Sequence, residues 1–367
     1  MVYTEDEKIW IWLASIDGIG VRRFYQLMSL FDSPNELIEA LQKNSTVFSF
    51  IGGKVLEKMK QGRNDGYGHL LIEKMEEQGI IAIARTNSQY PRMLEEIFDP
   101  PPVLFVRGDE KVLNTLSLGV VGTRKCTRYG RETARSFSRA IASKEITIVS
   151  GMARGIDSES HIGALEAEGK TVAVLGCGVD TIYPPENLKL FYQIIEHGAV
   201  ISEYAPGVAP MAGNFPARNR IISGLSRGVL IVEADIKSGT MFTVDYANQQ
   251  GREVYCVPGN INSPSSRGTN KLIKDGARMA LAPEDILSDY GITYTDEQMQ
   301  NTAQFQLDIF EQQIVSALLE GELNSEELFE KTQMEAAQLN TLLTLLELRG
   351  IIRQHAGRIF SINTTNL

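Results

Sequence analysis

The sequence predicts an α/β protein whose centre is a parallel sheet, with a helical segment before it and a smaller segment of three helices and two strands after it. Short apolar runs alternate with amphipathic stretches through the middle of the 367-residue chain. The N-terminal part shows only the three- and four-residue spacing of helices. A chain of this length commonly holds two or three domains. We expect a helical domain over 1–78, a sheet domain over 79–290, a polar linker over 291–304 and a small domain over 305–367.

In the helical segment, apolar residues such as Ile9, Leu13 and Ile16 recur at helical spacing. The string IDGIGVRRFYQLM (16–28) has the apolar-Gly-apolar-Gly turn of a helix-hairpin-helix, with Arg22 and Arg23 just after the turn. Backbone N–H groups of such a turn can contact DNA phosphate. An αα-hairpin that serves only as scaffold explains the string equally well.

Eight apolar runs in the middle of the chain are candidate strands. Runs of this kind, separated by amphipathic helices, indicate a parallel sheet that is covered on both faces. Ligands of such sheets bind at the carboxyl ends of the strands. The candidate strands are 80–84, 103–106, 118–121, 147–149, 172–175, 199–201, 229–232 and 254–257.

The C-terminal segment has the order of a winged helix, with helices expected over 305–319, 325–331 and 334–348 and strands over 351–354 and 358–362. That fold often binds duplex DNA through its third helix. Here the third helix carries no Lys or Arg, and residues 303–367 hold 4 basic and 9 acidic residues. We therefore expect a protein-interaction module, or one that uses only Arg349, Arg353 and Arg358 near the wing.

Composition excludes several classes of protein. No apolar run approaches the roughly 20 residues of a membrane helix, and no signal peptide is recognisable, so we expect a cytoplasmic protein without membrane contact. Cys126, Cys177 and Cys256 form no CxxC pair, and the four histidines are scattered. This argues against disulfides and a structural zinc site, and we expect neither a metal nor a cofactor.

The net charge of −10 hides regional differences. Residues 1–114 hold 13 basic and 17 acidic residues, residues 115–290 hold 19 and 18, and residues 291–367 hold 4 and 11. The basic residues of the middle region are also bunched, with Arg124, Lys125, Arg128 and Arg131 within eight positions. A local basic face can bind phosphate on an acidic protein because salt screens distant charges.

Four loops place Gly or Ser where an expected strand ends and a helix begins. Glycine lets the backbone approach a ligand, and the helix N-terminus offers free N–H groups to an anion. One such loop is more often a plain tight turn, but four in one sheet favour phosphate. None matches the dinucleotide pattern G-x-G-x-x-G or the Walker pattern, which disfavours a dinucleotide oxidoreductase and a P-loop NTPase. The loops are VVGTRKCTRYG with Gly122, Thr123 and Arg124, VSGMARGID with Ser150 and Gly151, VLGCGVDTIYP, and VEADIKSGT with Ser238, Gly239 and Thr240.

The string NFPARNRIISGLSRG (214–228) combines two arginines with an amide and an aromatic ring. We expect Arg218, Asn219 and Arg220 on the first turn of a helix, where paired guanidiniums bind phosphate and Phe215 stacks on a base. For any one of these residues the alternative stays open that the ring belongs to the core, or that one arginine forms an intramolecular salt bridge.

Asp157 and His161 lie four residues apart on an expected helix, as metal ligands or an acid/base pair would. We favour a structural explanation, in which the acid stabilises the helix N-terminus and the histidine is packed. Glu203 and Glu233 follow two of the strands, but no third group completes a hydrolytic set.

The ordered strings GTRKCTRYG, SGMARGIDSESH, TVAVLGCGVDTIYP, FPARNRIISGLSRGVLIVEA, SGTMFTVDYA, GREVYCVPG and GTNKLIKDGA resemble the DprA/Smf family of DNA-processing proteins over about residues 79–281. The flanks resemble that family's SAM-like or helix-hairpin-helix N-terminal domain and its winged helix. The resemblance implies an extended Rossmann-like core and a homodimer. It also implies that the protein binds and protects incoming single-stranded DNA and loads the RecA recombinase onto it in natural transformation.

The family's DNA pocket maps onto residues already chosen, namely Arg124, the Ser150–Gly151 loop, residues 218–220 and the loop of residues 238–240. Its dimer face would include residues 270–280, although Leu272 and Ile273 could equally be core. At Ala212 several relatives place a lysine that contacts DNA. We therefore expect either a lower affinity or a substitute such as Lys189.

Two other functions use the same loops. The core also resembles LOG-type nucleotide phosphoribohydrolases, whose PGGxGTxxE string supplies a catalytic glutamate. This chain has DIKSGTMFT there, with Thr243 at the glutamate position, so we expect a protein that is not an enzyme. A sensor for a small nucleotide is the third possibility.

Overall fold

The computed structural model describes residues 2–43, 46–62, 66, 68–292, 309–355 and 357–362. The chain divides into two compact units, Met1–Leu287 and Ser288–Leu367. The expected linker lies outside the described residues from position 293 onward.

Helices form the N-terminal part of the first unit. A capping box between Thr4 and Glu7 begins the first helix, and an edge-to-face contact between Trp10 and Phe24, with ring centroids 4.9 Å apart, joins it to the second. The hydroxyl of Tyr3 accepts a hydrogen bond from the N–H of Ala82 at 2.9 Å, which ties this part to the sheet. The elements are α1 (Glu5–Ser15), α2 (Val21–Met28), α3 (Pro34–Gln42), η1 (Thr46–Phe50), α4 (Gly53–Gln61) and α5 (His69–Glu77).

The turn between α1 and α2 is the expected hairpin. Ile16 and Ile19 are buried, and Gly18 adopts a φ of +97°, which favours glycine. Arg23 donates a hydrogen bond from Nη1 to the carbonyl of Gly18 at 2.7 Å. One of the two arginines after the turn therefore stabilises the turn itself, which favours the scaffold interpretation.

A nine-stranded sheet follows, in the order β1-β2-β6-β5-β4-β3-β7-β8-β9. All eight predicted strands are present. The ninth has only two residues, too few for any periodicity in the sequence. The strands are β1 (Ile80–Ala84), β2 (Val103–Gly108), β3 (Ser117–Val121), β4 (Thr147–Ser150), β5 (Thr171–Val174), β6 (Ala199–Ser202), β7 (Gly228–Ile231), β8 (Glu253–Cys256) and β9 (Arg278–Met279).

The expectation of a parallel sheet is correct from β6 to β9 and wrong for the first two strands. β1 pairs antiparallel with β2, and β2 antiparallel with β6. A parallel crossover usually needs a full helix to span the sheet. The connection between β1 and β2 contains only the four-residue helix α6 (Arg92–Glu95), so the chain returns in the opposite direction.

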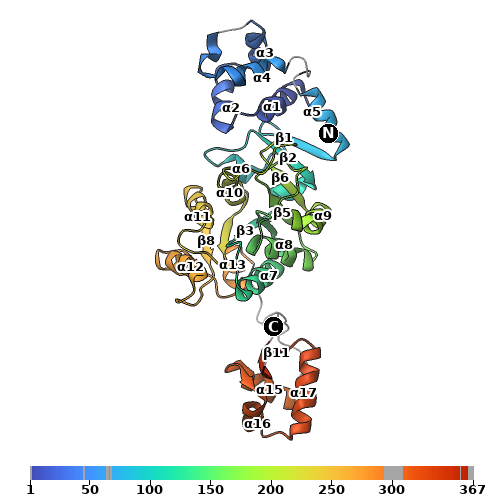
Figure 1. The fold of residues 1–367 in the computed structure, drawn as a ribbon, viewed down its shortest axis with the longest axis vertical. Helices are drawn as coiled ribbons and strands as arrows, with labels where there is room; N and C mark the ends of the chain where they lie inside the picture. Colours follow the sequence, from blue (N-terminus) through green and yellow to red (C-terminus); the bar gives the residue numbers. More distant parts are fainter. Residues whose placement is uncertain are drawn as a thin grey trace. The chain divides into compact units, whose positions relative to one another are not determined.

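Helices cover both faces of the sheet (Figure 1). In β5, Ala173 belongs to the core shared with α9, whereas Val172 and Val174 belong to the core shared with α10 and α11. Both faces of the sheet are therefore buried, which explains the near-continuous apolar runs in its strands. The remaining elements are η2 (Glu110–Asn114), α7 (Arg128–Ala142), α8 (Ile156–Glu166), η3 (Pro185–Asn187), α9 (Leu188–His197), α10 (Asn214–Leu225), α11 (Thr240–Gln249), α12 (Pro264–Lys274) and α13 (Pro283–Asp289).

The strand order reverses beside β3, because the chain passes from β3 through β4, β5 and β6 and then returns to place β7 on the other side of β3. At such a switch point the loops that leave neighbouring strands separate and open a crevice. The loops after β3, β4 and β7, all singled out in the sequence, meet there.

The second unit is a winged helix, as predicted. A three-stranded sheet in the order β10-β12-β11 packs with three helices around a core that includes Leu328, Leu346 and Phe360. Arg349 pairs with Glu311 at 2.8 Å and is therefore engaged within the domain. The elements are α15 (Ile309–Leu319), β10 (Leu323–Asn324), α16 (Ser325–Thr332), α17 (Ala336–Leu348), β11 (Ile352–His355) and β12 (Ile359–Ile362).

Within the ranges that the structure describes, no helix has the length and apolar character needed to cross a membrane.

Candidate nucleic-acid interface

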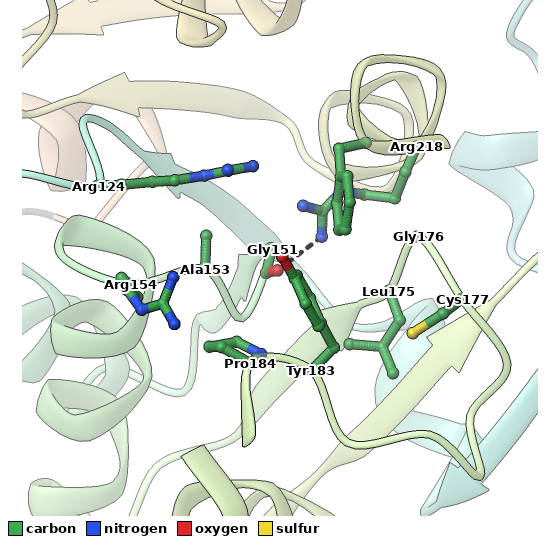
Figure 2. A pocket seen from close by; sticks show the side chains of 11 residues that line it. Arg124, Gly151, Ala153, Arg154, Leu175, Gly176, Cys177, Tyr183, Pro184 and Arg218 are labelled. Carbon is green, nitrogen blue, oxygen red and sulfur yellow. Dashed lines mark hydrogen bonds between the residues drawn. The ribbon is translucent and has the colours of Figure 1, made fainter. Parts of the chain in front are cut away.

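A cleft of about 560 Å³ lies at the carboxyl edge of the sheet, where the loops after β3 and β7 meet the start of α10. Most of the site residues expected from the sequence line it. They are Gly122, Thr123, Arg124, Phe215, Arg218, Asn219, Ser238, Gly239 and Thr240. Gly151 lines a small recess that adjoins the cleft through Arg124, Phe215 and Arg218 (Figure 2).

Two glycines let the loops after β3 and β4 pack together. A Cβ atom on Gly122 would lie 2.6 Å from the side chain of Ile156. Gly155 has a φ of +77°, and a Cβ atom there would lie 2.5 Å from the carbonyl oxygen of Thr123. Neither position tolerates a side chain without moving the loop that carries Arg124.

The buried carboxylate of Glu233 fixes the other end of this loop. It accepts hydrogen bonds from the N–H of Thr127 at 2.8 Å and the hydroxyl of Thr127 at 2.6 Å. It also accepts one from the hydroxyl of Ser265, on α12, at 3.2 Å. The Glu233 carboxylate thus has a structural role, because its hydrogen bonds hold the loop in place. Thr127 also caps α7 with its side chain.

Arg124 and two aromatic rings form the exposed wall of the recess. The Arg124 guanidinium carbon lies 5.5 Å from the centroid of the Phe215 ring, in a cation–π contact. The Phe215 ring in turn lies 5.4 Å from that of Tyr183. Sequence reasoning missed Tyr183, although its place at the end of the third glycine loop, in TIYP, was a usable signal.

Arg218 forms the floor of the cleft and is only 3% exposed. Its Nη1 donates to the carbonyl of Gly151 at 2.8 Å (Figure 2). The same nitrogen also donates to the carbonyl of Val174. Burial lowers the pKa of Arg218 to about 10, so it keeps its charge at neutral pH. A Cβ atom on Gly151 would lie 2.5 Å from the Arg218 Nη2, which is why this position takes glycine.

Arg220 differs from the expectation of paired guanidiniums. Its Nη2 binds Glu203 at 2.6 Å and its Nε binds Asp99 at 3.1 Å, and it does not line the cleft. Burial raises the pKa of Glu203, and the nearby Arg220 opposes that rise. The salt-bridge alternative considered for one arginine of the string is therefore realised by Arg220.

The expected start of the Arg218 helix was wrong. α10 begins at Asn214, so Pro216 lies within the first turn, where the missing N–H of proline is not needed. Arg218 and Arg220 consequently lie further along the helix. Residues two apart on a helix point in roughly opposite directions, about 200° apart, so one phosphate cannot meet both.

The two serine loops differ in their openness. The hydroxyl of Ser150 donates to the carbonyl of Val120 at 2.6 Å and is fully buried, so Ser150 does not line the cleft. The hydroxyl of Ser238 donates to that of Thr240 at 2.9 Å. Gly239, which caps α11, provides no side-chain hydrogen bond to the helix N-terminus. The N–H groups of the first turn of α11 are instead used within the loop, because those of Thr240 and Met241 donate to the hydroxyl and the carbonyl of Ser238 at 3.2 and 3.0 Å.

Asp157 and His161 do not act as a pair. Asp157 lines the cleft, and burial raises its pKa to about 6 despite the neighbouring Arg218. His161 contacts Thr171 through Nδ1 at 2.6 Å, and burial lowers its pKa to about 3, so it is neutral. The packed histidine favoured from the sequence is what the structure shows.

Among the described residues, no group of three or more His, Cys, Asp or Glu side chains is arranged to hold a metal ion. Thr243, which stands at the glutamate position of the phosphoribohydrolase string, lines the cleft. Its side chain ends in a hydroxyl and not in an ionisable carboxyl group. Ala212 also lines the cleft, whereas Lys189, the substitute expected from the sequence, does not.

The fold and site define a doubly wound α/β protein with guanidinium groups at its strand-end cleft. The sequence model of the family described as DNA recombination-mediator protein A matches residues 81–291. The model of the DprA winged helix domain matches residues 299–358. The chain therefore belongs to the DprA/Smf family of DNA-processing proteins.

Known relatives agree with this assignment. The chain is 37% identical to Protein Smf of Synechocystis sp. over 294 residues, covering 78% of this chain and 73% of that one. It is 43% identical to DNA processing protein DprA of Bacillus subtilis over 224 residues, covering 60% and 75%.

Two solved structures share the fold at 31% identity. The structure of DprA from Streptococcus pneumoniae matches with a TM-score of 0.66 and covers 79% of this chain and 99% of that chain. A structure that describes the single-stranded DNA binding mode of DNA processing protein A from Helicobacter pylori matches with a TM-score of 0.54, covering 59% and 97%.

Proposed function

We propose that the cleft binds the sugar-phosphate backbone of single-stranded DNA without strong sequence preference. The observation that carries this is the exposed Arg124 guanidinium held over the Phe215 ring, above the buried positive charge of Arg218. Phosphate meets the arginines, and an unpaired base stacks on an aromatic ring. The relative from Helicobacter pylori, whose structure concerns this binding mode, supports the proposal.

Binding to an oligo-dT and to a matching duplex, measured over a salt series, tests the proposal. Affinity for the single strand falls steeply with salt, by a log–log slope of about −0.7 for each phosphate contacted. Arg124→Ala weakens binding about tenfold and reduces that slope by about one contact. Arg218→Ala is the less clean variant, because it also removes hydrogen bonds to two main-chain carbonyls.

The other two functions predict different results. A nucleotide sensor binds a mononucleotide at least as tightly as the oligonucleotide. A phosphoribohydrolase releases free base from nucleoside monophosphates. Our proposal needs no chemistry at Thr243, so Thr243→Ala leaves the predicted binding of oligo-dT unchanged. Tight oligo-dT binding that does not depend on salt contradicts a phosphate site.

We also propose that the chain protects incoming DNA in transformation, delivers it to the RecA recombinase and works as a homodimer. Support for the dimer comes from the edge position of β9, where Met279 and the nearby Leu281 are 48% and 67% exposed. By contrast, Leu272 and Ile273 pack partly against the core.

Light scattering and a recombinase assay test these two partners. If the β9 edge is the dimer interface, Leu281→Asp converts the dimer to a monomer. An unchanged molecular mass in light scattering would contradict an interface at this edge. The wild-type chain should protect oligo-dT from nuclease and accelerate the assembly of RecA on it. Arg124→Ala should do neither.

A further inference from the structure

Helix α7 begins directly after the loop that carries Arg124, and it contains four arginines. Arg128, Arg131, Arg135 and Arg139 are spaced by three, four and four residues. At 3.6 residues per turn they fall within an arc of about 80°, along roughly 16 Å of helix. The opposite side of α7 is apolar and buried, through Ala134, Phe137 and Ile141 among others. We call the four-arginine side the α7 arginine face.

Two of these arginines form ion pairs, and the other two form none with a described residue. Arg128 pairs with Glu132 at 2.8 Å, and Arg135 pairs with Glu166 and, at 3.9 Å, with Glu159. Within the described residues, Arg131 and Arg139 form no ion pair, and both are exposed. The unpaired charges are two turns apart and flank the paired Arg135.

The α7 arginine face continues the cleft. Arg124 lines the cleft, the exposed Lys125 follows it, and Thr127 caps the helix that begins at Arg128. Arg124, Lys125 and Arg128 therefore lie within five positions that lead from the cleft loop into the helix. The protein as a whole carries a net charge of −10, so a basic ridge is not a general property of its surface.

We propose that the α7 arginine face is a second phosphate-binding surface, which takes the part of a single-stranded nucleic acid that extends beyond the cleft. The inference rests on the proposed function of the cleft. Proteins that bind single strands without sequence preference use grooves that follow the backbone over about 4–16 nucleotides, and a cleft of about 560 Å³ is too small for the longer strands of that range. Arginine forks bind phosphate bidentately, and exposed ion pairs such as Arg128–Glu132 are weak because water and salt screen them. A phosphate can therefore take the place of the carboxylate.

The length of the oligonucleotide separates the two surfaces. The affinities of the full chain and of the double variant Arg131→Ala/Arg139→Ala are measured for oligo-dT of about 5 and about 30 nucleotides. The short strand fills the cleft alone, so its affinity should change less than twofold. For the long strand, affinity should fall about tenfold, and the salt slope should shrink by about 1.4, for two lost contacts at about 0.7 each.

Two further variants control for charge and for folding. Arg131→Lys/Arg139→Lys keeps the charge and should retain most of the affinity for the long strand. Arg92→Ala/Lys111→Ala removes two exposed basic side chains from α6 and η2 and should leave both affinities unchanged. Thermal unfolding of each variant shows that the fold is intact.

The outcomes distinguish this inference from the proposed function. If the wild type binds neither length, both fail. If Arg124→Ala weakens both lengths but Arg131→Ala/Arg139→Ala weakens neither, the cleft stands and the α7 arginine face is not a binding surface. Equal loss on both lengths also overturns it, because the helix would then act only through the cleft.

Discussion

At the scale of single residues, the cleft separates side chains that reach solvent from side chains that set its charge. Arg124 is exposed and free to meet a ligand, whereas Arg218 is buried under main-chain carbonyl contacts and supplies a fixed positive charge. Arg220, two residues on, has its charge matched by two carboxylates on another side of the helix. Residue type alone does not distinguish these roles.

Ala212 offers a gain-of-function test, because it lines the cleft without contributing charge. Ala212→Lys should tighten single-stranded DNA binding by about 1 kcal/mol, roughly fivefold, and steepen the salt slope by about 0.7. Titration of a fluorescent oligo-dT at several salt concentrations measures both. Gln89→Lys adds the same charge outside the cleft and is the control. An unchanged salt slope for Ala212→Lys would show that no phosphate passes this position.

Asp157 makes stability depend on pH. Burial raises its pKa from 3.8 to about 6, so the folded state holds this proton more tightly than the unfolded state. The stabilising effect of the proton is complete below about pH 4 and is lost as pH rises through 6. Asparagine cannot ionise. The unfolding free energy of Asp157→Asn relative to wild type should therefore rise by about 2–3 kcal/mol between about pH 4 and pH 7, at about 1.4 kcal/mol per pKa unit.

Urea unfolding at a series of pH values measures this difference. His161 is present in both proteins, so its titration cancels. Asp245→Asn, at an exposed position on α11, controls for the loss of a charge alone. A constant difference between Asp157→Asn and wild type would mean that the carboxylate is not destabilised by burial.

At the scale of elements, the cleft is formed by loops whose positions are fixed by hydrogen bonds to a residue outside the cleft. Glu233 connects the loop after β3 with α12, through Thr127 and Ser265. A second connection runs through the backbone, from the N–H of Ala234 to the carbonyl of Ser265 at 2.7 Å. The position of Arg124 therefore depends on a carboxylate that does not line the cleft.

Glu233→Gln tests this dependence. The amide keeps the size of the side chain but lacks the charge that strengthens the bonds from Thr127. Affinity for oligo-dT should fall about three- to tenfold in the wild-type background and change little in Arg124→Ala, because Glu233 acts through Arg124. Ser265→Ala removes the longest of the three bonds to Glu233, together with a contact to the Ser263 hydroxyl, and should have a smaller effect. Equal losses in both backgrounds would mean that Glu233 supports the fold generally.

At the scale of the whole molecule, charge is distributed unevenly between the parts of the chain. The winged helix is acidic, its third helix α17 carries no Lys or Arg, and Arg349 is paired with Glu311. Duplex-binding winged helices place basic side chains on that helix or at the wing. This domain has the fold of a DNA-binding module without the charge.

Truncation of the chain after residue 292 should leave affinity for oligo-dT within about twofold of the full-length value. The isolated winged helix should show no duplex binding at moderate salt. Gel-shift or anisotropy titrations at matched salt decide both points. Duplex affinity of the isolated domain comparable with that of the whole chain would refute the assignment of this domain to protein contacts.

The sequence by itself determined the kinds of element and the loops that carry the chemistry. Eight strands, the helical N-terminal part and the winged helix follow from apolar periodicity, which depends only on local spacing. The glycine loops follow from the backbone freedom that tight strand-to-helix turns need. The short strands β9 and β10 are too brief to leave a pattern, and the antiparallel course of β1 and β2 depends on the length of their connection.

Only the tertiary structure decided which charged side chains are free. Arg218 and Arg220 belong to one sequence string, yet one lies under the cleft and the other is enclosed by Asp99 and Glu203, which come from distant parts of the chain. Tyr183 joins the site because its loop meets Phe215 across the edge of the sheet. Charge pairing and ring contacts depend on distances between residues far apart in sequence, and these are fixed only when the sheet brings its loops together.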